Sequence, residues 1–155
     1  MTYHAPGQLI GYPIVDLRAE VDRDLPGYLR ALEGGLIEYL ATLGLAGRTV
    51  PGRTGVWLDE PLRKIAAMGI RAKRWIVSHG FALNVENSLE GFDWIVPCGI
   101  PDAGVTSLLQ ELGPDGMPPW ETISGDIHRA VEKSLERPLE LVRGAEVLAR
   151  LGSSP

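Results

Sequence analysis

The sequence offers one thiol, Cys98, as its strongest candidate nucleophile. A free thiol has a pKa of about 8.5, so a neighbouring group must favour the thiolate before it attacks a carbonyl at neutral pH. Pro97 stiffens the chain before Cys98, and Gly99 allows close approach and leaves N–H groups that can face an oxyanion. These residue types suit a nucleophilic cysteine, although a lone cysteine is more often a buried, inert thiol.

Lys64 is the candidate for activating such a thiol. It begins the apolar segment 65–70, which is typical of a buried strand. Because a strand alternates its faces, we expect Lys64 to share a face with Ala66 and Met68. A lysine there either lies at a solvated edge, the more frequent case, or is desolvated in a pocket. Desolvation lowers the pKa of a lysine and allows it to act as a base.

Two histidines lie in segments suited to ligand contact. We expect His79 between two strands, either as a general acid or base or as a packed ring bonded to a carbonyl. His4 lies in a loop rich in hydrogen-bonding groups, which is either a binding loop or a turn. His4, His79 and His128 are far apart in sequence and accompany a single cysteine, so we expect no metal site.

The elements that must position these residues follow from hydrophobic period and turn residues. Residues 8–17 form a short apolar run without helical period, which predicts a buried strand. An amphipathic stripe of leucines and isoleucine predicts a helix over 25–43. The stretch 49–85 predicts a sheet with strands at 55–58, 64–70, 75–78 and 82–85.

The second half of the chain is expected to be mainly helical. Short helices are predicted at 89–94, 106–112 and 126–135, and the tail 139–151 suggests one more. Rigid loops are predicted at 97–102 and 114–119. The pattern indicates an α+β fold with a sheet-rich centre and helices on either side.

Composition limits the class of protein. The 155 residues suit one domain, with 45% hydrophobic and 23% charged residues. A net charge of -5 argues against a general nucleic-acid binder and against docking on an anionic membrane. No apolar run is long enough to span a bilayer, the first residues do not resemble a signal peptide, and one cysteine cannot form an internal disulfide. We therefore expect a protein of the reducing cytoplasm.

Five segments together resemble the octanoyltransferase family, also called lipoyl(octanoyl) transferase or lipoate–protein ligase B. They occur in the family's order and are Thr-Tyr-His-Ala-Pro-Gly-Gln-Leu-Ile-Gly-Tyr-Pro-Ile (2–14), Gly-Arg-Thr-Gly-Val-Trp (52–57), Arg-Lys-Ile-Ala-Ala-Met-Gly-Ile-Arg (63–71), His-Gly-Phe-Ala-Leu-Asn-Val (79–85) and Pro-Cys-Gly-Ile-Pro-Asp-Ala-Gly-Val-Thr-Ser-Leu (97–108). The resemblance covers nearly everything from Thr2 to Leu112.

The resemblance implies a catalytic cysteine–lysine dyad of Cys98 and Lys64, whose separation of 98 − 64 = 34 positions fits the family. Lys73 does not align with the motif. The family's acyl site is lined by three segments, to which we add His79 as a candidate. The matching residues here are Thr2, Tyr3, His4, Ala67, Met68, Gly69, Gly80, Phe81 and Ala82.

The implied fold is that of biotin and lipoate ligase catalytic domains, with a mixed central sheet flanked by helices. The implied activity moves an octanoyl group from acyl carrier protein to a lysine of the lipoyl domains of 2-oxoacid dehydrogenases and of the glycine-cleavage H protein. A thioester donor is already activated, so no ATP, metal or other cofactor is expected. We expect a monomer with neither nucleic-acid nor membrane partners.

Two departures from the family stand out. The family has glycine where this chain has Ala5. It also carries a segment before Thr2, including an Arg-Gly-Gly stretch that helps to bind the acyl group, so we expect residues 1–155 to be a single, N-terminally shortened acyltransferase domain.

Three alternatives remain open. An ATP-dependent lipoate or biotin ligase on the same fold would form an acyl-adenylate and need no cysteine. A cysteine thioesterase would pass the acyl group to water. An inactive shortened homologue would only bind carrier or lipoyl domains.

Overall fold

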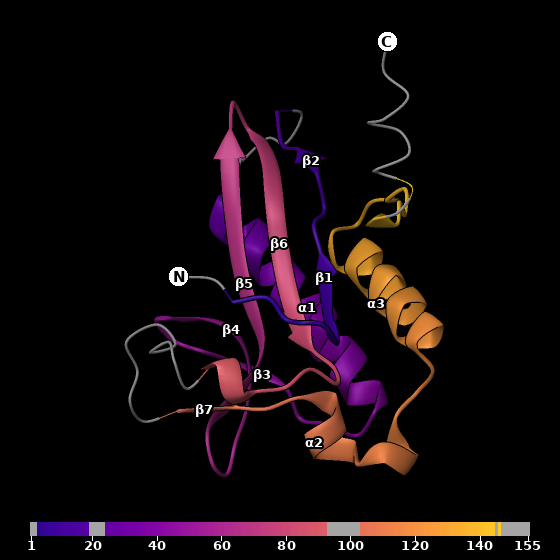
Figure 1. The fold of residues 1–155 in the computed structure, drawn as a ribbon. Coiled ribbons are helices and arrows are strands. Elements are labelled where there is room, and N and C mark those ends of the chain that lie inside the picture. Colours follow the sequence, from indigo (N-terminus) through magenta and orange to yellow (C-terminus); the bar gives the residue numbers. More distant parts are fainter. Residues whose placement is uncertain (1–2, 19–23, 93–102, 145, 147–155) are drawn as a thin grey trace.

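The computed structural model describes residues 3–18, 24–92, 103–144 and 146 (Figure 1). The strands are β1 (Gln8–Gly11), β2 (Val15–Asp16), β3 (Arg48–Val50), β4 (Arg53–Leu58), β5 (Arg63–Lys73), β6 (Ile76–Asn84) and β7 (Gly104–Val105). The helices are α1 (Leu25–Thr42), α2 (Leu108–Leu112) and α3 (Trp120–Ser134), with single 3-10 turns η1 (Glu90–Phe92) and η3 (Pro114–Gly116).

One sheet joins all of these strands. Its order is β1-β6-β5-β4-β3, with β2 also pairing with β6 and β7 with β5. Every pairing is antiparallel except that of β7 with β5, which is parallel. The sheet is therefore mixed, as expected, and the α+β fold class is confirmed. The long hairpin of β5 and β6 forms its centre (Figure 1).

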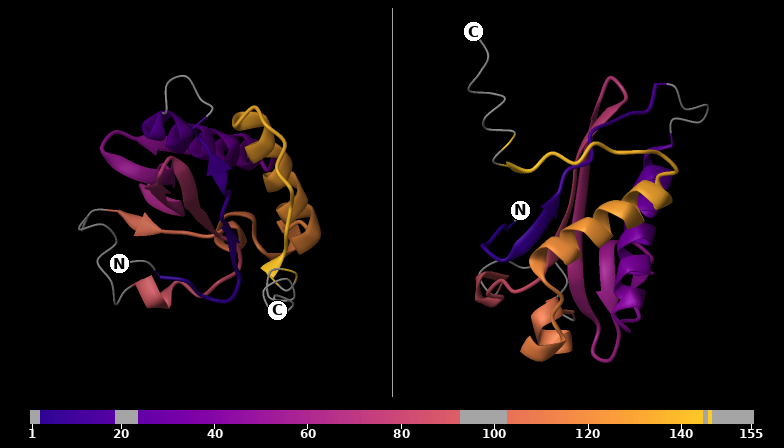
Figure 2. Two further views of the ribbon diagram at one scale, coloured as in Figure 1. Left: turned by 90° about the horizontal axis from the view of Figure 1, so that it is seen from above. Right: turned by 90° about the vertical axis from the view of Figure 1, so that its right-hand side faces the viewer.

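Helix α1 supplies the main apolar cover of the sheet. Leu32, Leu36 and Leu40 recur every four residues and are fully buried. Helix α3 packs beside α1 through Ile123, Ile127 and Val131. Apart from Trp120, the exposed residues of α3 are polar, namely Glu121, Thr122, Arg129 and Lys133. Seen from above, α1 runs along one face of the sheet while α3 stands beside the β1 edge (Figure 2, left).

The two faces of the β5–β6 hairpin differ in side-chain size. Ala66 and Met68 lie opposite Leu83 and Phe81, and all four belong to or pack against the hydrophobic core. Because strand side chains alternate, the residues between them point to the other face. That outer face is turned towards the viewer in Figure 1 and carries neither α1 nor α3.

Several predicted elements differ in extent from the observed ones. The helix at 25–43 is confirmed as α1, whereas α3 begins at Trp120 instead of residue 126. The predicted strands at 75–78 and 82–85 are one strand, β6, so placing His79 between two strands was wrong. Strand β6 stays paired with β5 at His79, although His79 has φ +64° and the small residues Gly80 and Ala82 follow it.

The N-terminal strand was predicted as one buried run over 8–17, and this was wrong. It divides into β1 and β2, and Ile10, Tyr12 and Ile14 are 43%, 51% and 73% exposed. The reason is topological, since β1 lies at the end of the strand order and only one of its faces meets the core.

In the C-terminal part, residues 139–143 of the helix predicted for 139–151 are not helical, whereas Gly144 and Glu146 are; residue 145 and residues 147–151 lie outside the described part. Strands β3 and β7 were not predicted, because two or three residues carry too little pattern. Among the described residues, no helix is long and apolar enough to cross a membrane.

Candidate functional site

Lys64 is the second residue of β5, and its side chain is buried, with 8% of the residue exposed. Its Nζ lies 4.5 Å from the centre of the Trp57 ring, over the aromatic face. Trp57 lies directly across from Lys64 on β4. The ammonium therefore has an aromatic face in place of much of its water, an arrangement that attracts a cation electrostatically.

A bulge decides which face of the sheet Lys64 occupies. Val56 pairs with Ala66, but the next residue, Trp57, pairs with Lys64, so Ile65 is an extra residue on β5. The bulge breaks the alternation at this point. The expectation that Lys64 shares a face with Ala66 and Met68 was therefore wrong, because it assumed an uninterrupted strand.

A close backbone approach makes room beside Lys64. Gly55 has φ +119°, and a Cβ there would lie 2.5 Å from the Ala66 carbonyl oxygen and 3.4 Å from Lys64 Cε. The Gly55 N–H donates to Glu33 Oε1 at 2.9 Å. Glu33 belongs to α1 and is 7% exposed, so a buried carboxylate holds the backbone that flanks Lys64.

The strand that follows Cys98 in sequence returns to Lys64. Gly104 and Val105 of β7 pair with Arg63 and Lys64, and the Thr106 N–H donates to the Lys64 carbonyl oxygen at 3.0 Å. Cys98 itself and Thr2 lie outside the described residues. Of the expected dyad, only Lys64 belongs to the described residues.

The segment that precedes Cys98 meets another predicted site residue. The Tyr3 ring contacts Phe92 of η1 edge to face, with ring centres 5.0 Å apart. Gly91 packs closely against the same side chain, because a Cβ on Gly91 would lie 2.2 Å from Cζ and from the hydroxyl oxygen of Tyr3. Described residues on both sides of the 93–102 stretch thus contact residues of the predicted site, Tyr3 on one side and Lys64 on the other.

The predicted acyl-binding segments of β5 and β6 are neighbours. Ala67 pairs with Ala82, Met68 with Phe81, and Gly69 with Gly80. The residues on the outer face are Ala67, Gly69, Gly80 and Ala82, which form a lane of small side chains. Met68 and Phe81 turn to the core instead. Ala67 and Gly69 are exposed, and nothing lies within 4 Å of a Cβ at Gly69, so a ligand could approach the sheet closely there. Gly80 and Ala82 are buried, and a Cβ at Gly80 would lie 2.3 Å from the Gly11 carbonyl oxygen.

Beside this lane, His4 is hydrogen-bonded to Gln8 and Tyr12, two residues that were not predicted as site residues. Gln8 Oε1 accepts from the Ala5 N–H at 3.1 Å and lies 3.3 Å from His4 Nδ1. With Nδ1 donating to that oxygen, Nε2 is left to accept from the Tyr12 hydroxyl 3.3 Å away. The Tyr12 ring in turn meets the His79 ring edge to face at 5.6 Å.

These contacts bring together His4 and His79, which are 75 positions apart (79 − 4). A signal for Gln8 and Tyr12 was present in the sequence: with Ile10 they occupy every second position of the first strand segment and so share its outer face. It was obscured by treating the whole segment as buried.

Arg63 is tied to α2 by a two-pronged ion pair. Its Nε and Nη2 donate to Glu111 Oε1 and Oε2, each at 2.7 Å. The hydrogen bonds from Arg63 lower the pKa of the Glu111 carboxyl, with a smaller contribution from Thr106, against the opposing effect of burial. The pair anchors α2 next to Lys64.

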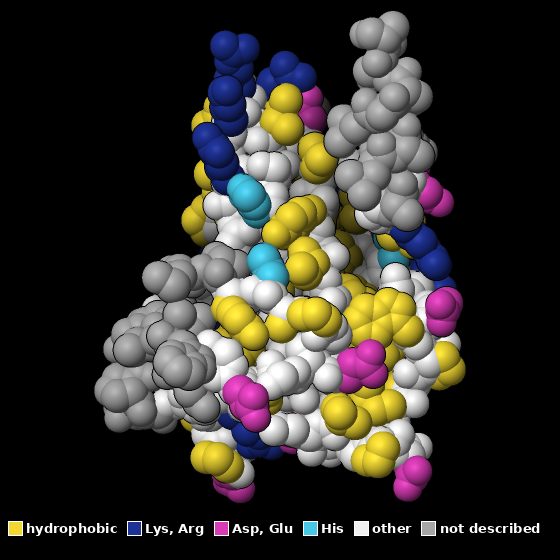
Figure 3. All heavy atoms as spheres, viewed as in Figure 1, with side chains coloured by type: hydrophobic (Ala, Val, Ile, Leu, Met, Phe, Trp, Pro, Cys, Tyr) yellow, Lys and Arg dark blue, Asp and Glu magenta, His cyan; other side chains and the backbone are white. Residues whose placement is uncertain are grey.

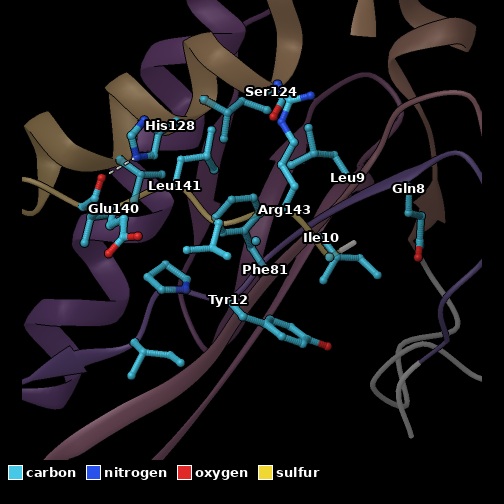
Figure 4. A pocket seen from close by; sticks show the side chains of 18 of the residues that line it. Gln8, Leu9, Ile10, Tyr12, Phe81, Ser124, His128, Glu140, Leu141 and Arg143 are labelled. Atoms are coloured by element: carbon cyan, nitrogen blue, oxygen red, sulfur yellow. Dashed lines mark hydrogen bonds between the residues drawn. The ribbon is translucent and has the colours of Figure 1, made fainter. Parts of the chain in front are cut away.

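A separate cavity of about 770 Å³ lies between β1, α3 and residues 139–144 (Figure 4). Its walls are largely apolar, and His128 at its side bonds to the Leu139 carbonyl oxygen at 2.9 Å. Of the predicted site residues, only Phe81 lines it. The cavity is therefore distinct from the surroundings of Lys64.

Comparison with known sequences gives a consistent result. The family model for the lipoyl protein ligase A/B catalytic domain matches residues 1–125. An octanoyltransferase of Leifsonia xyli subsp. xyli is 53% identical over 117 residues, covering 73% of this chain and 51% of that protein. An octanoyltransferase of Thermobifida fusca is 46% identical over 162 residues, covering 100% of this chain and 63% of that protein. The chain thus spans about half the length of several curated relatives it matches.

Solved structures agree on the fold. A bipartite lipoate protein ligase from Thermoplasma acidophilum superposes with a TM-score of 0.65 at 17% identity, covering 96% of this chain and 60% of that one. The biotin protein ligase of Aquifex aeolicus gives a TM-score of 0.62 at 14% identity, covering 84% and 53%. At these identities the likeness establishes the architecture, which is that of lipoate and biotin ligase catalytic domains.

Proposed function

Because the chain belongs to the lipoyl protein ligase A/B catalytic domain family, and its curated relatives are octanoyltransferases, we propose that it transfers an octanoyl group through an acyl-cysteine. The donor is octanoyl-acyl carrier protein. The acceptors are the lysine amines of lipoyl domains in 2-oxoacid dehydrogenases and in the glycine-cleavage H protein. We place this activity in the cytoplasm.

The observation that carries the proposal is the position of Lys64. It is a buried lysine on the outer face of the sheet, and the strand after the Cys98 segment pairs with its backbone. Gly104 lies six positions after Cys98 (104 − 98), and such a stretch of chain spans at most about 20 Å. This limit supports Lys64 as the partner of Cys98.

In the proposed first step, the Cys98 thiol loses its proton with the help of Lys64, and the thiolate attacks the carbonyl carbon of the donor thioester. The tetrahedral oxyanion collapses, the bond to the carrier sulfur breaks, and the carrier thiol leaves with a proton. The product is an octanoyl thioester on Cys98. Backbone N–H groups near Gly99 would stabilise the oxyanion.

In the second step, the neutral amine of the acceptor lysine attacks the Cys98 thioester. An amide bond forms, the Cys98–acyl bond breaks, and Lys64 takes up a proton from the attacking nitrogen. The acyl chain lies over the exposed part of the lane, Ala67 and Gly69, with Tyr3 and His4 at its border. Each buried methylene would contribute about 0.8 kcal/mol to binding.

The test is acyl-enzyme formation followed by intact mass measurement. Octanoyl-acyl carrier protein should add one octanoyl group to the wild type and none to Cys98→Ala. Lys64→Ala should slow the addition by about 10²- to 10⁴-fold, the usual range for general acid–base catalysis. Lys133→Ala, which removes an exposed lysine on α3, is the matched control.

The same experiment separates the alternatives. A ligase would require ATP and resist thiol alkylation, and a thioesterase would release octanoate without modifying a lipoyl domain. An inactive homologue would bind carrier or acceptor without forming the adduct. An undiminished rate in Cys98→Ala would remove the cysteine from the mechanism. For Lys64→Ala, circular dichroism checks that the fold survives, and an unchanged pH profile of Cys98 alkylation would remove its role in forming the thiolate.

A further inference from the structure

The tip of the β5–β6 hairpin is a basic surface on an acidic protein. Arg71, Lys73 and Arg74 are all exposed there, and we call these three residues the basic tip. Lys and Arg side chains gather at this end of the molecule in Figure 3. The whole chain carries a net charge of -5, so the basic tip opposes the overall charge.

Most of the other surface cations in the described part of the chain form ion pairs. Ion pairs with carboxylates are made by Arg18, Arg30, Arg48, Arg63, Arg129 and Lys133. Among the described residues, no carboxylate lies within ion-pair distance of the basic tip. Within the described part of the chain, its positive charge is therefore not neutralised by an ion pair and can meet a partner.

The turn at the tip is built from unusual residues. Lys73 pairs with Ile76, which leaves Arg74 and Trp75 as a two-residue loop with φ values of +52° and +67°. A two-residue hairpin loop with both φ values positive favours Asn-Gly, because residues with a Cβ are strained there. Backbone strain at an exposed arginine and tryptophan indicates that these side chains serve a purpose other than stability.

The composition suits contact with a protein. Trp75 and Ile76 are 37% and 39% exposed next to the three cations. Tryptophan and arginine are enriched in protein interfaces. A nucleic acid would need a broader positive field than three cations on an acidic chain provide.

We propose that the basic tip is the docking surface for an acidic protein, the carrier that delivers the acyl group; this rests on the proposed function. Lys73 lies nine residues from Lys64 along β5, about 30 Å in an extended strand. A carrier presents its acyl group at the end of a long flexible arm, which suits docking at a distance from the reacting atoms. The acceptor lysine has only a four-carbon stem.

The test compares two donors on two variants. Lys73→Glu/Arg74→Glu reverses two tip charges, and Arg129→Glu/Lys133→Glu reverses two charges on α3 as the matched control. With octanoyl-carrier protein, the tip variant should raise KM by about tenfold or more with kcat unchanged, since like charges then meet at the interface. With octanoyl-pantetheine, which has no protein to dock, both variants should react like the wild type.

Three results would overturn the docking surface. They are an unchanged KM for the carrier donor in the tip variant, an equal loss with octanoyl-pantetheine, and a loss confined to transfer from preformed acyl-enzyme to the acceptor. Titration of octanoyl-carrier protein into Cys98→Ala, with and without the two tip substitutions, measures docking even if no acyl group moves. Weaker binding of the tip variant supports the inference; equal binding refutes it, whatever happens to the proposed chemistry.

Discussion

Lys64 is held by residues that are small, aromatic or distant in sequence. Trp57 lies under its ammonium, and Gly55 leaves the space through which its methylenes pass. Neither residue is charged. The position of the amine therefore depends on packing and backbone geometry at these two residues, and a single methyl group at Gly55 should disturb it.

Gly55→Ala is expected to destabilise the protein by about 2 kcal/mol or more, because φ is positive and the new Cβ meets the Ala66 carbonyl oxygen. Gly69→Ala on β5 is the matched control, since nothing lies within 4 Å of a Cβ there. Urea denaturation of both variants measures the difference. Equal stabilities of Gly55→Ala and Gly69→Ala would show that the backbone of β4 can shift at Gly55 to accept a Cβ.

Glu111 gives a pH-dependent contribution to stability. Arg63 depresses the pKa of its folded-state carboxyl, so the stabilisation is present above the unfolded pKa of about 4.3 and is lost as pH falls through the folded pKa. Glu111→Gln should therefore be less stable than wild type at pH 7, by roughly 1 kcal/mol for a partly buried pair. This difference in stability between Glu111→Gln and the wild type should disappear at acidic pH.

Urea midpoints at pH 7, 4 and 3 test this dependence. Asp126→Asn, which breaks the exposed pair with Arg129, should show little difference from wild type at any of these values. A Glu111→Gln deficit that persists unchanged at pH 3 would mean that the carboxyl's charge is not the cause.

Among the elements, the α1–α3 contact depends on one glycine. A Cβ at Gly35 would lie 3.1 Å from the Ala130 carbonyl oxygen and 3.2 Å from Val131 Cα. These are backbone atoms of the facing helix and can move only with it. The close approach lets the apolar stripe of α3 reach the core.

Gly35→Ala and Gly125→Ala form a matched pair within these two helices. Both replacements gain about 1 kcal/mol of helix propensity, but only Gly35 faces backbone, whereas Gly125 faces the end of the Arg129 side chain at 3.5 Å. We expect Gly35→Ala to be less stable than Gly125→Ala by about 1–3 kcal/mol in chemical denaturation. Equal increases in stability in the two variants would show that α1 and α3 can move apart at Gly35 without an energetic cost.

Asn84 links three elements through buried hydrogen bonds. Its Oδ1 accepts from Gln8 Nε2 at 2.9 Å, and its Nδ2 donates to the Thr106 carbonyl oxygen at 2.9 Å, which joins β1, β6 and the residue after β7. Asn84→Ala leaves both partners unsatisfied and should cost about 2–4 kcal/mol. Ser78→Ala, at an exposed position of the same strand, should change thermal stability little; similar losses in both would refute the network's importance.

The elements with long periodic patterns could be predicted, and the short or irregular ones could not. The leucine stripe of α1 repeats over five turns, so its bounds were nearly right. Strand β7 has two residues and exists only because β5 is beside it. The bulge at Ile65 likewise depends on pairing with β4, which no local alternation can reveal.

The candidate site divides in the same way. Lys64, His4 and the small residues of β5 and β6 were found through their match to a family, and the structure places the latter side by side. Glu33 was missed because a glutamate within a leucine-rich helix looks like part of its solvated face. Its burial follows from the sheet that α1 covers, a tertiary fact absent from the helix itself.

At the scale of the whole molecule, the parts with separate proposed roles lie at different places on one sheet. Lys64 lies where β4, β5 and β7 meet, the basic tip lies at the far end of β5, and the cavity lies beside β1. The long hairpin connects the first two without a flexible joint. The proposed docking and the proposed acyl transfer should therefore be separable by mutation, as the two-donor experiment requires.

The place of β1 in the sheet also determines when the fold can be completed. Gln8 pairs with Asn84, 76 positions later (84 − 8), whereas β5 and β6 are joined by a two-residue turn. Local pairing forms quickly, and closing a long loop is slow, so the hairpin should form before β1 adds to it. In pulse-labelled hydrogen exchange during refolding, β5 and β6 amides should be protected before those of Leu9 and Ile10. On the ribosome, β1 is synthesised well before β6 and would then wait for its partner, exposed to chaperones and to neighbouring nascent chains.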